Sequence, residues 1–212
     1  MFLSRIELDT GRQDTRRALS SPQVLHAAIE NCFLTKNGAK DRKLWRVDNL
    51  NNRLYVLVLS PEKPDFSLFV SQFCAADVTG EIKDYQPLLT RMRDGTRLRF
   101  RIRGNPVHSV AKEKGVRGKI YAHVTPTQQR EWLAKKAPSC GFELPENSFD
   151  VVETKLLRFS RGEKNRLVEI RTAVFEGELL VTDAALFVQT LTQGIGRAKA
   201  YGCGLMTVIF VK

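Results

Sequence analysis

The chain has 212 residues, and its 34 Lys and Arg against 23 Asp and Glu give a formal net charge of +11. A hydrophobic content of 42% is that of a globular protein and excludes a largely disordered chain. The positive charge indicates a polyanionic partner, with nucleic acid as the first expectation and an anionic membrane surface as the alternative. We expect no transmembrane span, because no run of about 20 apolar residues occurs, and the N-terminal MFLSRIELDT is not typical of a signal peptide.

The cysteines and histidines are scattered along the chain and show no spacing typical of metal ligands. No CxxC pair is present, so we expect no zinc ribbon, no other metal site and no cofactor. Isolated thiols favour a reducing, cytoplasmic compartment in which they act as small buried hydrophobic groups. The four cysteines are Cys32, Cys74, Cys140 and Cys203.

The first half of the chain predicts the order β-α-β-β-α-β. The polar, arginine-containing segment 9–19 is expected to be a loop, and Pro22 after Ser21 then opens a helix with an apolar face that runs to about Leu34. The expected strands are 2–8, 44–48, 54–60 and 81–85, and the second expected helix is 66–73.

His26 lies in the second turn of the first predicted helix, next to its apolar stripe. Free backbone N–H groups at a helix start attract phosphate, and an imidazole can move protons during phosphodiester chemistry. The alternative is a half-buried histidine bonded to a nearby carbonyl, which is the stronger interpretation for an isolated histidine.

Residues 97–103 read RLRFRIR, which predicts a strand with three apolar residues on one face and four arginines on the other. A row of like charges is repulsive unless it is solvated or faces an anion. The basic segment 107–119 that follows is expected to be a mobile loop.

The second half predicts a similar order of elements. Thr125 is expected to cap a helix that runs to about Ala137. Asp183 is expected to cap a later helix, which ends with Gly194 in the left-handed αL conformation. The expected strands are 151–159, 167–175, a short strand 178–181 after a turn at Glu176-Gly177, and 205–211. The prediction is an α+β fold of two tandem ferredoxin-like domains, 1–90 and 91–212.

The hairpin 151–175 carries many basic residues and could clasp a stem of A-form RNA, which proteins recognise mainly through shape, phosphates and 2′-hydroxyls. The alternative is a solubilising tip, for which Glu163 and Glu169 argue. The basic residues are Lys155, Arg158, Arg161, Lys164, Arg166 and Arg171.

The segment 194–205, GIGRAKAYGCGL, joins the last predicted helix to the last strand. It fits neither GxGxxG nor GxxxxGK[ST], so we expect no nucleotide cofactor. Glycine lets another molecule approach bare backbone, and Arg197 and Lys199 suggest that this molecule is an anion. The alternative is a tight connection in which the glycines only solve a packing problem.

Six segments occur in the order seen in CasE-type CRISPR-associated endoribonucleases, the precursor-crRNA processing subunits of type I-E Cascade complexes, and the chain resembles this family over nearly its whole length. LRFRIRGNP and GIGRAKAYGCGL are the most specific of them. The others are MFLSRIELDT, SPQVLHAAIENCF, TPTQQREWL followed by GF, and AVFEGELLV.

The resemblance implies two ferredoxin-like domains and metal-independent cleavage of a repeat-derived RNA stem-loop. It implies attack of a 2′-hydroxyl on the adjacent phosphorus, leaving a 2′,3′-cyclic phosphate and a 5′-hydroxyl, by an enzyme that stays bound to its product. The implied partners are precursor crRNA, crRNA and other Cascade subunits, especially the backbone subunit, with no membrane. The rival hypothesis is a non-catalytic RNA-binding subunit of a ribonucleoprotein.

The resemblance places the family's catalytic histidine on His26, and we expect the active site where the two domains meet. Family members often have a tyrosine three residues earlier, where this chain has Gln23. His26 therefore acts with electrostatics alone or with another group such as Tyr201 or Lys199. The residues expected at the RNA are Arg101, Arg103, Lys155, Arg158, Arg161, Lys164, Arg166, Gly194, Gly196, Arg197, Lys199, Gly202 and Gly204.

Overall fold

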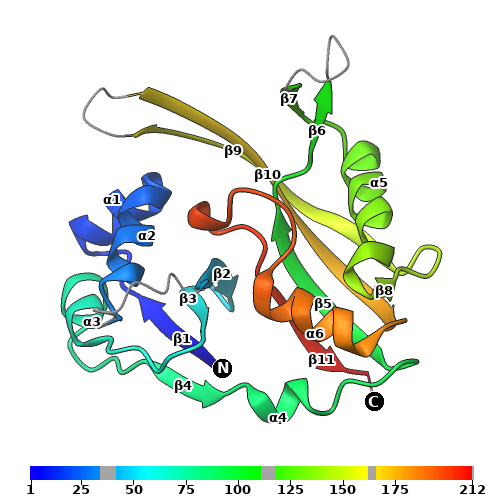
Figure 1. The fold of residues 1–212 in the computed structure, drawn as a ribbon. Coiled ribbons are helices and arrows are strands. Elements are labelled where there is room, and N and C mark those ends of the chain that lie inside the picture. Colours follow the sequence, from blue (N-terminus) through cyan, green and yellow to red (C-terminus); the bar gives the residue numbers. More distant parts are fainter. Residues whose placement is uncertain (34–41, 111–117, 162–165, 212) are drawn as a thin grey trace.

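The structure, a computed structural model, describes residues 1–33, 42–110, 118–161 and 166–211. Two antiparallel sheets lie beside each other, one in each half of the chain (Figure 1). Within the described part of the chain, no helix is long and apolar enough to cross a membrane.

The first sheet has the strand order β2-β3-β1-β4, with every neighbouring pair antiparallel. This order and the sequence of elements are those of a ferredoxin-like fold, as predicted. The strands are β1 (Phe2–Leu8), β2 (Leu44–Leu50), β3 (Arg53–Ser60) and β4 (Glu81–Asp84), and the helices are α1 (Gln13–Ser20), α2 (Pro22–Glu30) and α3 (Ser67–Phe73). The short helix α4 (Gln86–Leu89) leads to the second half.

The predicted loop 9–19 is wrong, because α1 occupies most of it. Only Thr15 and Ala18 of this helix are buried, so its sequence lacks the apolar stripe that would reveal a helix. Tertiary hydrogen bonds hold it instead: Thr15 Oγ1 donates to the carbonyl of Phe73 at 3.0 Å, and Arg12 donates to the carbonyl of Ser71 at 2.5 Å.

The second sheet contains the order β11-β5-β10, with β9 and β8 both paired to β10. Its helices begin where their caps predict. Thr125 forms a capping box with Gln128, and Asp183 accepts a hydrogen bond from the N–H of Leu186 at 2.9 Å. The strands are β5 (Arg97–Gly104), β8 (Phe142–Glu143), β9 (Phe149–Arg161), β10 (Arg166–Val181) and β11 (Met206–Phe210), the helices α5 (Pro126–Lys136) and α6 (Ala184–Gln193), and the 3-10 turns η1 (Pro138–Cys140) and η2 (Lys199–Tyr201).

The turn predicted at Glu176-Gly177 is absent, since β10 runs through it as one strand of 16 residues. Gly177 is required for a steric reason and not for a turn. A Cβ atom there would lie 2.2 Å from the carbonyl oxygen of Ser148, so the glycine lets the start of β9 approach closely. The pairing of β9 and β10 shifts register between Val174 and Phe175.

The basic segment 107–119 is also only partly the predicted loop. Its first residues form β6 (Val107–Val110), which pairs with β7 (Lys119–Ala122) in a separate two-stranded ribbon. Residues 111–117 lie outside the described residues. The alternating segment 97–103 is confirmed as a strand, with Leu98, Phe100 and Ile102 buried.

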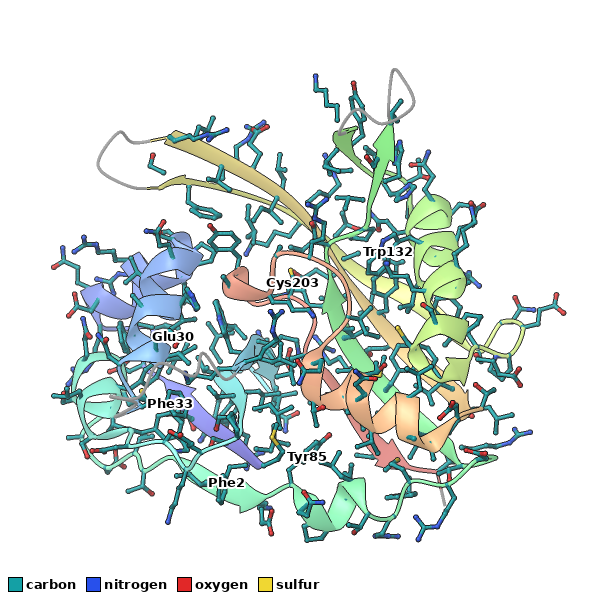
Figure 2. The ribbon with its side chains drawn as sticks, viewed as in Figure 1. Phe2, Glu30, Phe33, Tyr85, Trp132 and Cys203 are labelled. Carbon is teal, nitrogen blue, oxygen red and sulfur yellow. The ribbon has the colours of Figure 1, made fainter. Side chains whose placement is uncertain are left out.

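The cores of both halves are built from apolar side chains, and three of the four cysteines are buried as free thiols. Cys203 lies between the two sheets, and Trp132 extends from α5 over the second sheet (Figure 2). Burial raises the pKa of Cys203 to about 12, so this thiol stays protonated at neutral pH, as expected for a small hydrophobic group.

Arg46 on β2 connects the first sheet to the second from a fully buried position. Its Nε and Nη2 donate to the carboxylate of Asp48 at 2.7–3.0 Å. Its Nη1 donates to the carbonyls of Arg101 (2.7 Å) and Leu205 (2.8 Å), and its Nη2 also donates to Thr207 Oγ1 (2.9 Å). One guanidinium thus fixes β2 against β5 and the start of β11.

We predict that Arg46→Met lowers the free energy of unfolding by about 3–5 kcal/mol, because it leaves Asp48 buried without its main partner. A urea titration measures this loss. Replacing both members, as Arg46→Met with Asp48→Leu, should recover most of it, because no buried charge then lacks its counter-charge.

The matched control is Arg53→Met, a substitution on the neighbouring strand. The Arg53 side chain is 66% exposed and pairs with Glu7. This change should leave the urea midpoint almost unaltered, because exposed ion pairs contribute little. Equal midpoints for Arg46→Met and wild type would show that Arg46 does not hold the sheets together.

Candidate nucleic-acid interface

The helix α2 carries His26 at the edge of the first core. Pro22 occupies its first turn, and Leu25 and Ile29 are buried, which leaves the His26 side chain 34% exposed. The Nδ1 atom lies 3.9 Å from Glu30 Oε1, one turn further along. Among the described residues, no group accepts or donates a hydrogen bond at Nδ1, so the alternative of a carbonyl-bonded Nδ1 is not observed.

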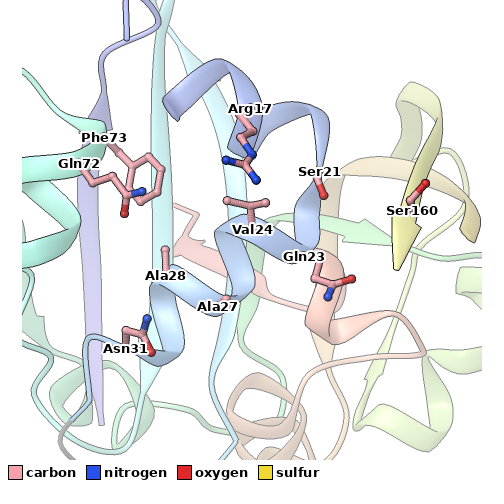
Figure 3. A pocket seen from close by; sticks show the side chains of 10 residues that line it. All are labelled: Arg17, Ser21, Gln23, Val24, Ala27, Ala28, Asn31, Gln72, Phe73 and Ser160. Carbon is pink, nitrogen blue, oxygen red and sulfur yellow. The ribbon is translucent and has the colours of Figure 1, made fainter. Parts of the chain in front are cut away.

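Gln23, one turn before His26, points away from the core and toward the β9–β10 ribbon. It lines a hollow of about 500 Å³ together with Arg17 of α1 and Ser160 of β9. Figure 3 shows the Gln23 amide on the side of α2 that faces Ser160. Its Oε1 is buried and has no hydrogen-bond partner within the described part of the chain. This position therefore offers an unused acceptor beside His26.

The turn η2 brings the glycine-rich loop to the same place. It packs against α2, and the ring of Tyr201 lies 4.9 Å from the ring of Phe159 on β9. The loop, the helix that carries His26 and the ribbon thus meet in one region, with η2 between α2 and the ribbon strands (Figure 1). These elements come from both halves of the chain.

The glycines of the loop face the protein interior more than solvent. Gly202 and Gly204 are buried, and a Cβ atom on Gly202 would lie 2.9 Å from the Trp45 ring. Gly202 also has φ of +79°, which side chains rarely adopt. Gly194 has φ 72° and ψ 160°, so its φ is positive as predicted but it is not in the αL conformation. These contacts agree with the alternative interpretation, in which the glycines allow tight packing of the loop.

The two cations of the loop differ in their surroundings. Arg197 is exposed, whereas Lys199 Nζ donates to the carbonyl of Gln193 at 2.7 Å, at the C-terminal end of α6. Burial, and then the nearby Arg42, lowers the pKa of Lys199. Lys199 therefore ties η2 to α6, and Arg197 is the loop cation that an approaching anion can reach.

The ribbon holds the exposed cations Lys155, Arg158 and Arg166. Arg158 donates to Glu169 on the paired strand at 2.6 Å, so its charge is partly balanced. Lys164 and the side chain of Arg161 lie outside the described residues.

Arg101 and Arg103 on β5 lie at the junction between the halves, and carboxylates lie beside them. Arg101 pairs with Asp48 at 3.3 Å and with Glu176, and Arg103 lies 3.9 Å from Glu153. Antiparallel pairing places Glu176 directly opposite Arg101, a cross-strand pair that the EGE of residues 176–178 could have signalled. The arginine row of β5 is therefore partly neutralised within the protein.

A family model described as CRISPR associated protein matches residues 1–209. The CRISPR-associated endoribonuclease Cse3 of Thermus thermophilus is 28% identical over 98% of this chain and 99% of its own length. The CRISPR system Cascade subunit CasE of Escherichia coli is 26% identical over 87% of this chain and 89% of its own length.

Solved structures agree with these relatives. Cse3 bound to a 19 nt RNA superposes with a TM-score of 0.84 at 28% identity, covering 99% of this chain and 100% of the other. Thermus thermophilus Cse3 bound to an RNA that represents a pre-cleavage complex gives 0.80 at 26% identity, covering 98% of both chains.

We predict that Gly202→Ala destabilises the protein more than Gly95→Ala. Both glycines have φ of +79°, but a Cβ at Gly95 has nothing within 4 Å, whereas at Gly202 it meets Trp45. The Gly95 variant should lose about 1 kcal/mol of unfolding free energy from backbone strain, and the Gly202 variant a further 1–3 kcal/mol, roughly, from overpacking. If thermal unfolding shows equal losses of unfolding free energy for the two variants, the Trp45 ring moves aside without an energetic cost.

Proposed function

The chain belongs to the family of CRISPR-associated proteins, and we propose that it is an endoribonuclease that cuts precursor crRNA at the stem-loop of the CRISPR repeat. The relatives named Cse3 and CasE align along most of their length, and Cse3 is itself named an endoribonuclease. The net charge of +11 suits an RNA substrate. The single observation that carries the proposal is that α2, the helix that carries His26, meets η2, which in turn contacts the basic ribbon through Tyr201 and Phe159.

In the proposed reaction the ribose 2′-hydroxyl attacks the adjacent phosphorus and the bond to the 5′-oxygen breaks. The products carry a 2′,3′-cyclic phosphate and a 5′-hydroxyl, and no metal takes part. His26 acts either as the base that removes the 2′-hydroxyl proton or as the acid that protonates the leaving oxygen. Holding the 2′-oxygen in line with the phosphorus contributes at least as much as the proton transfer.

The surroundings of His26 support this role. Glu30 lies one turn further along α2, near Nδ1, and its other oxygen accepts a hydrogen bond from Lys43 at 3.1 Å. A carboxylate in this position can orient the imidazole. Of the two candidates for a second group, Lys199 is engaged with a carbonyl, whereas Tyr201 lines the same hollow as Pro22 and Leu25 of α2. We assign the assisting role to Tyr201.

The exposed cations of the ribbon and Arg197 are the proposed phosphate contacts, together with Arg161 and Lys164. Arg101, Lys199 and the four glycines act less directly, by shaping the surface on which the RNA lies. Many phosphate contacts explain how the enzyme stays bound to its product crRNA. A curated relative is named a Cascade subunit, so we propose that this chain joins other Cascade subunits, above all the backbone subunit, in the cytoplasm.

A second candidate function is a non-catalytic RNA-binding subunit. The observation that favours it is Gln23, which stands where the family often has a tyrosine and which cannot exchange a proton at neutral pH. The same basic surface would serve this function.

We predict that His26→Ala cuts the repeat RNA about 10²- to 10⁴-fold more slowly than wild type, in chelator, while it binds the RNA as tightly. Single-turnover cleavage and fluorescence anisotropy measure the two quantities. The control is His108→Ala, which removes an exposed histidine from β6 and should cut at the wild-type rate.

Three outcomes would contradict parts of the proposal. Unchanged cutting by the His26→Ala protein would remove His26 from the reaction. A need for added metal would overturn the metal-free mechanism. Tight binding by the wild type without any cleavage would select the RNA-binding subunit.

A further inference from the structure

A second hollow, of about 240 Å³, lies between the N-terminal helices and the base of the β9–β10 ribbon. Trp45, Leu157 and Tyr201 contribute its aromatic and apolar walls, and the exposed side chains of Asn49 and Lys155 border it. Charged groups line it as well, so it combines apolar walls with polar groups, as ligand pockets in proteins do. These charged residues are Arg101, Arg103 and Glu153. Both halves of the chain contribute to it.

Two side chains at this hollow have unused hydrogen-bond donors. Trp45 is 3% exposed, and neither its Nε1 nor the Nε of Arg103 has a hydrogen-bond partner among the described residues. Buried N–H groups are nearly always paired in folded proteins, so these two are free to donate to an acceptor that the described residues do not supply. Carbonyl oxygens and ring nitrogens are such acceptors.

The size and walls of the hollow favour one planar ring. Its volume lies below the range of pockets for drug-sized ligands, so it suits a single aromatic ring and not a base pair. The Tyr201 ring is one wall of the hollow and can stack on such a ring, and Lys155 places a cation at the border, where it can attract the phosphate of the same nucleotide.

We propose that this hollow binds one unpaired nucleobase of the RNA, next to the stem, and that it helps to select the cleavage site. This inference rests on the proposed function. Proteins recognise RNA sequence mainly at unpaired bases, which stack on aromatic side chains and hydrogen-bond through their edges. The wall also includes Pro22 and Leu25 of α2, so a base held here would place its neighbouring phosphate near the helix that carries His26.

The test uses the His26→Ala protein, which keeps the RNA uncut, and the repeat hairpin with its unpaired flanking nucleotides. Each unpaired nucleotide is replaced in turn by an abasic one, and affinity is measured by fluorescence anisotropy. We expect one position at which the missing base lowers affinity about 5- to 100-fold, the range for a stacked base.

The matched protein variants are Leu157→Trp and Leu156→Trp in the same background. Leu157 lines the hollow, whereas Leu156, next to it on β9, is on the opposite face of the ribbon and is 38% exposed. Filling the hollow through Leu157→Trp should make the intact and abasic RNAs bind equally. The Leu156→Trp protein should still distinguish them, and the affinity for a blunt hairpin checks that both variants are folded.

The outcomes separate this inference from the proposed function. Equal affinity for all abasic RNAs, or a Leu157→Trp protein that still distinguishes them, would overturn the base-binding hollow even if the wild type cuts the hairpin. A wild-type protein that neither binds nor cuts the hairpin would overturn the proposed function, and the inference with it.

Discussion

The buried guanidinium of Arg46 is the interaction on which the arrangement of the two sheets depends. A charge inside a protein is costly unless hydrogen bonds replace its water, and here Asp48, two carbonyls and a hydroxyl do so. The carbonyl acceptors belong to Arg101, on β5, and to Leu205, at the end of the glycine-rich loop. Both flank the candidate site. The junction is specific because few other placements of the sheets would satisfy every donor.

This junction explains how residues far apart in sequence form one surface. Fixing β2 against β5 and β11 holds Trp45 beneath Gly202, and the turn η2 is thereby held against α2. The glycine-rich loop therefore shapes the interface through its packing, and its exposed cation and the ribbon supply the charge. The proposed RNA lies where α2, η2 and the ribbon meet.

Much of the fold could be predicted from local patterns. The alternation in RLRFRIR and the caps Thr125 and Asp183 are confirmed because each depends on neighbours in sequence. The helix α1 was missed because tertiary hydrogen bonds, and not an apolar stripe, hold it. Gly177 and the pair Arg46–Asp48 were missed for a related reason. A glycine within a strand and two charges on a strand do not show which distant backbone they contact. The catalytic role of His26 is a prediction from the family resemblance, and the surroundings of this residue came only from the structure.

The measurement that tests the central claim most directly is the structure of the His26→Ala protein bound to an uncut repeat hairpin. The account predicts that the stem lies along the β9–β10 ribbon and that the phosphate to be cut lies beside position 26, between α2 and η2. A complex with the RNA on the outer face of α5 and α6, or with that phosphate far from α2, would contradict it.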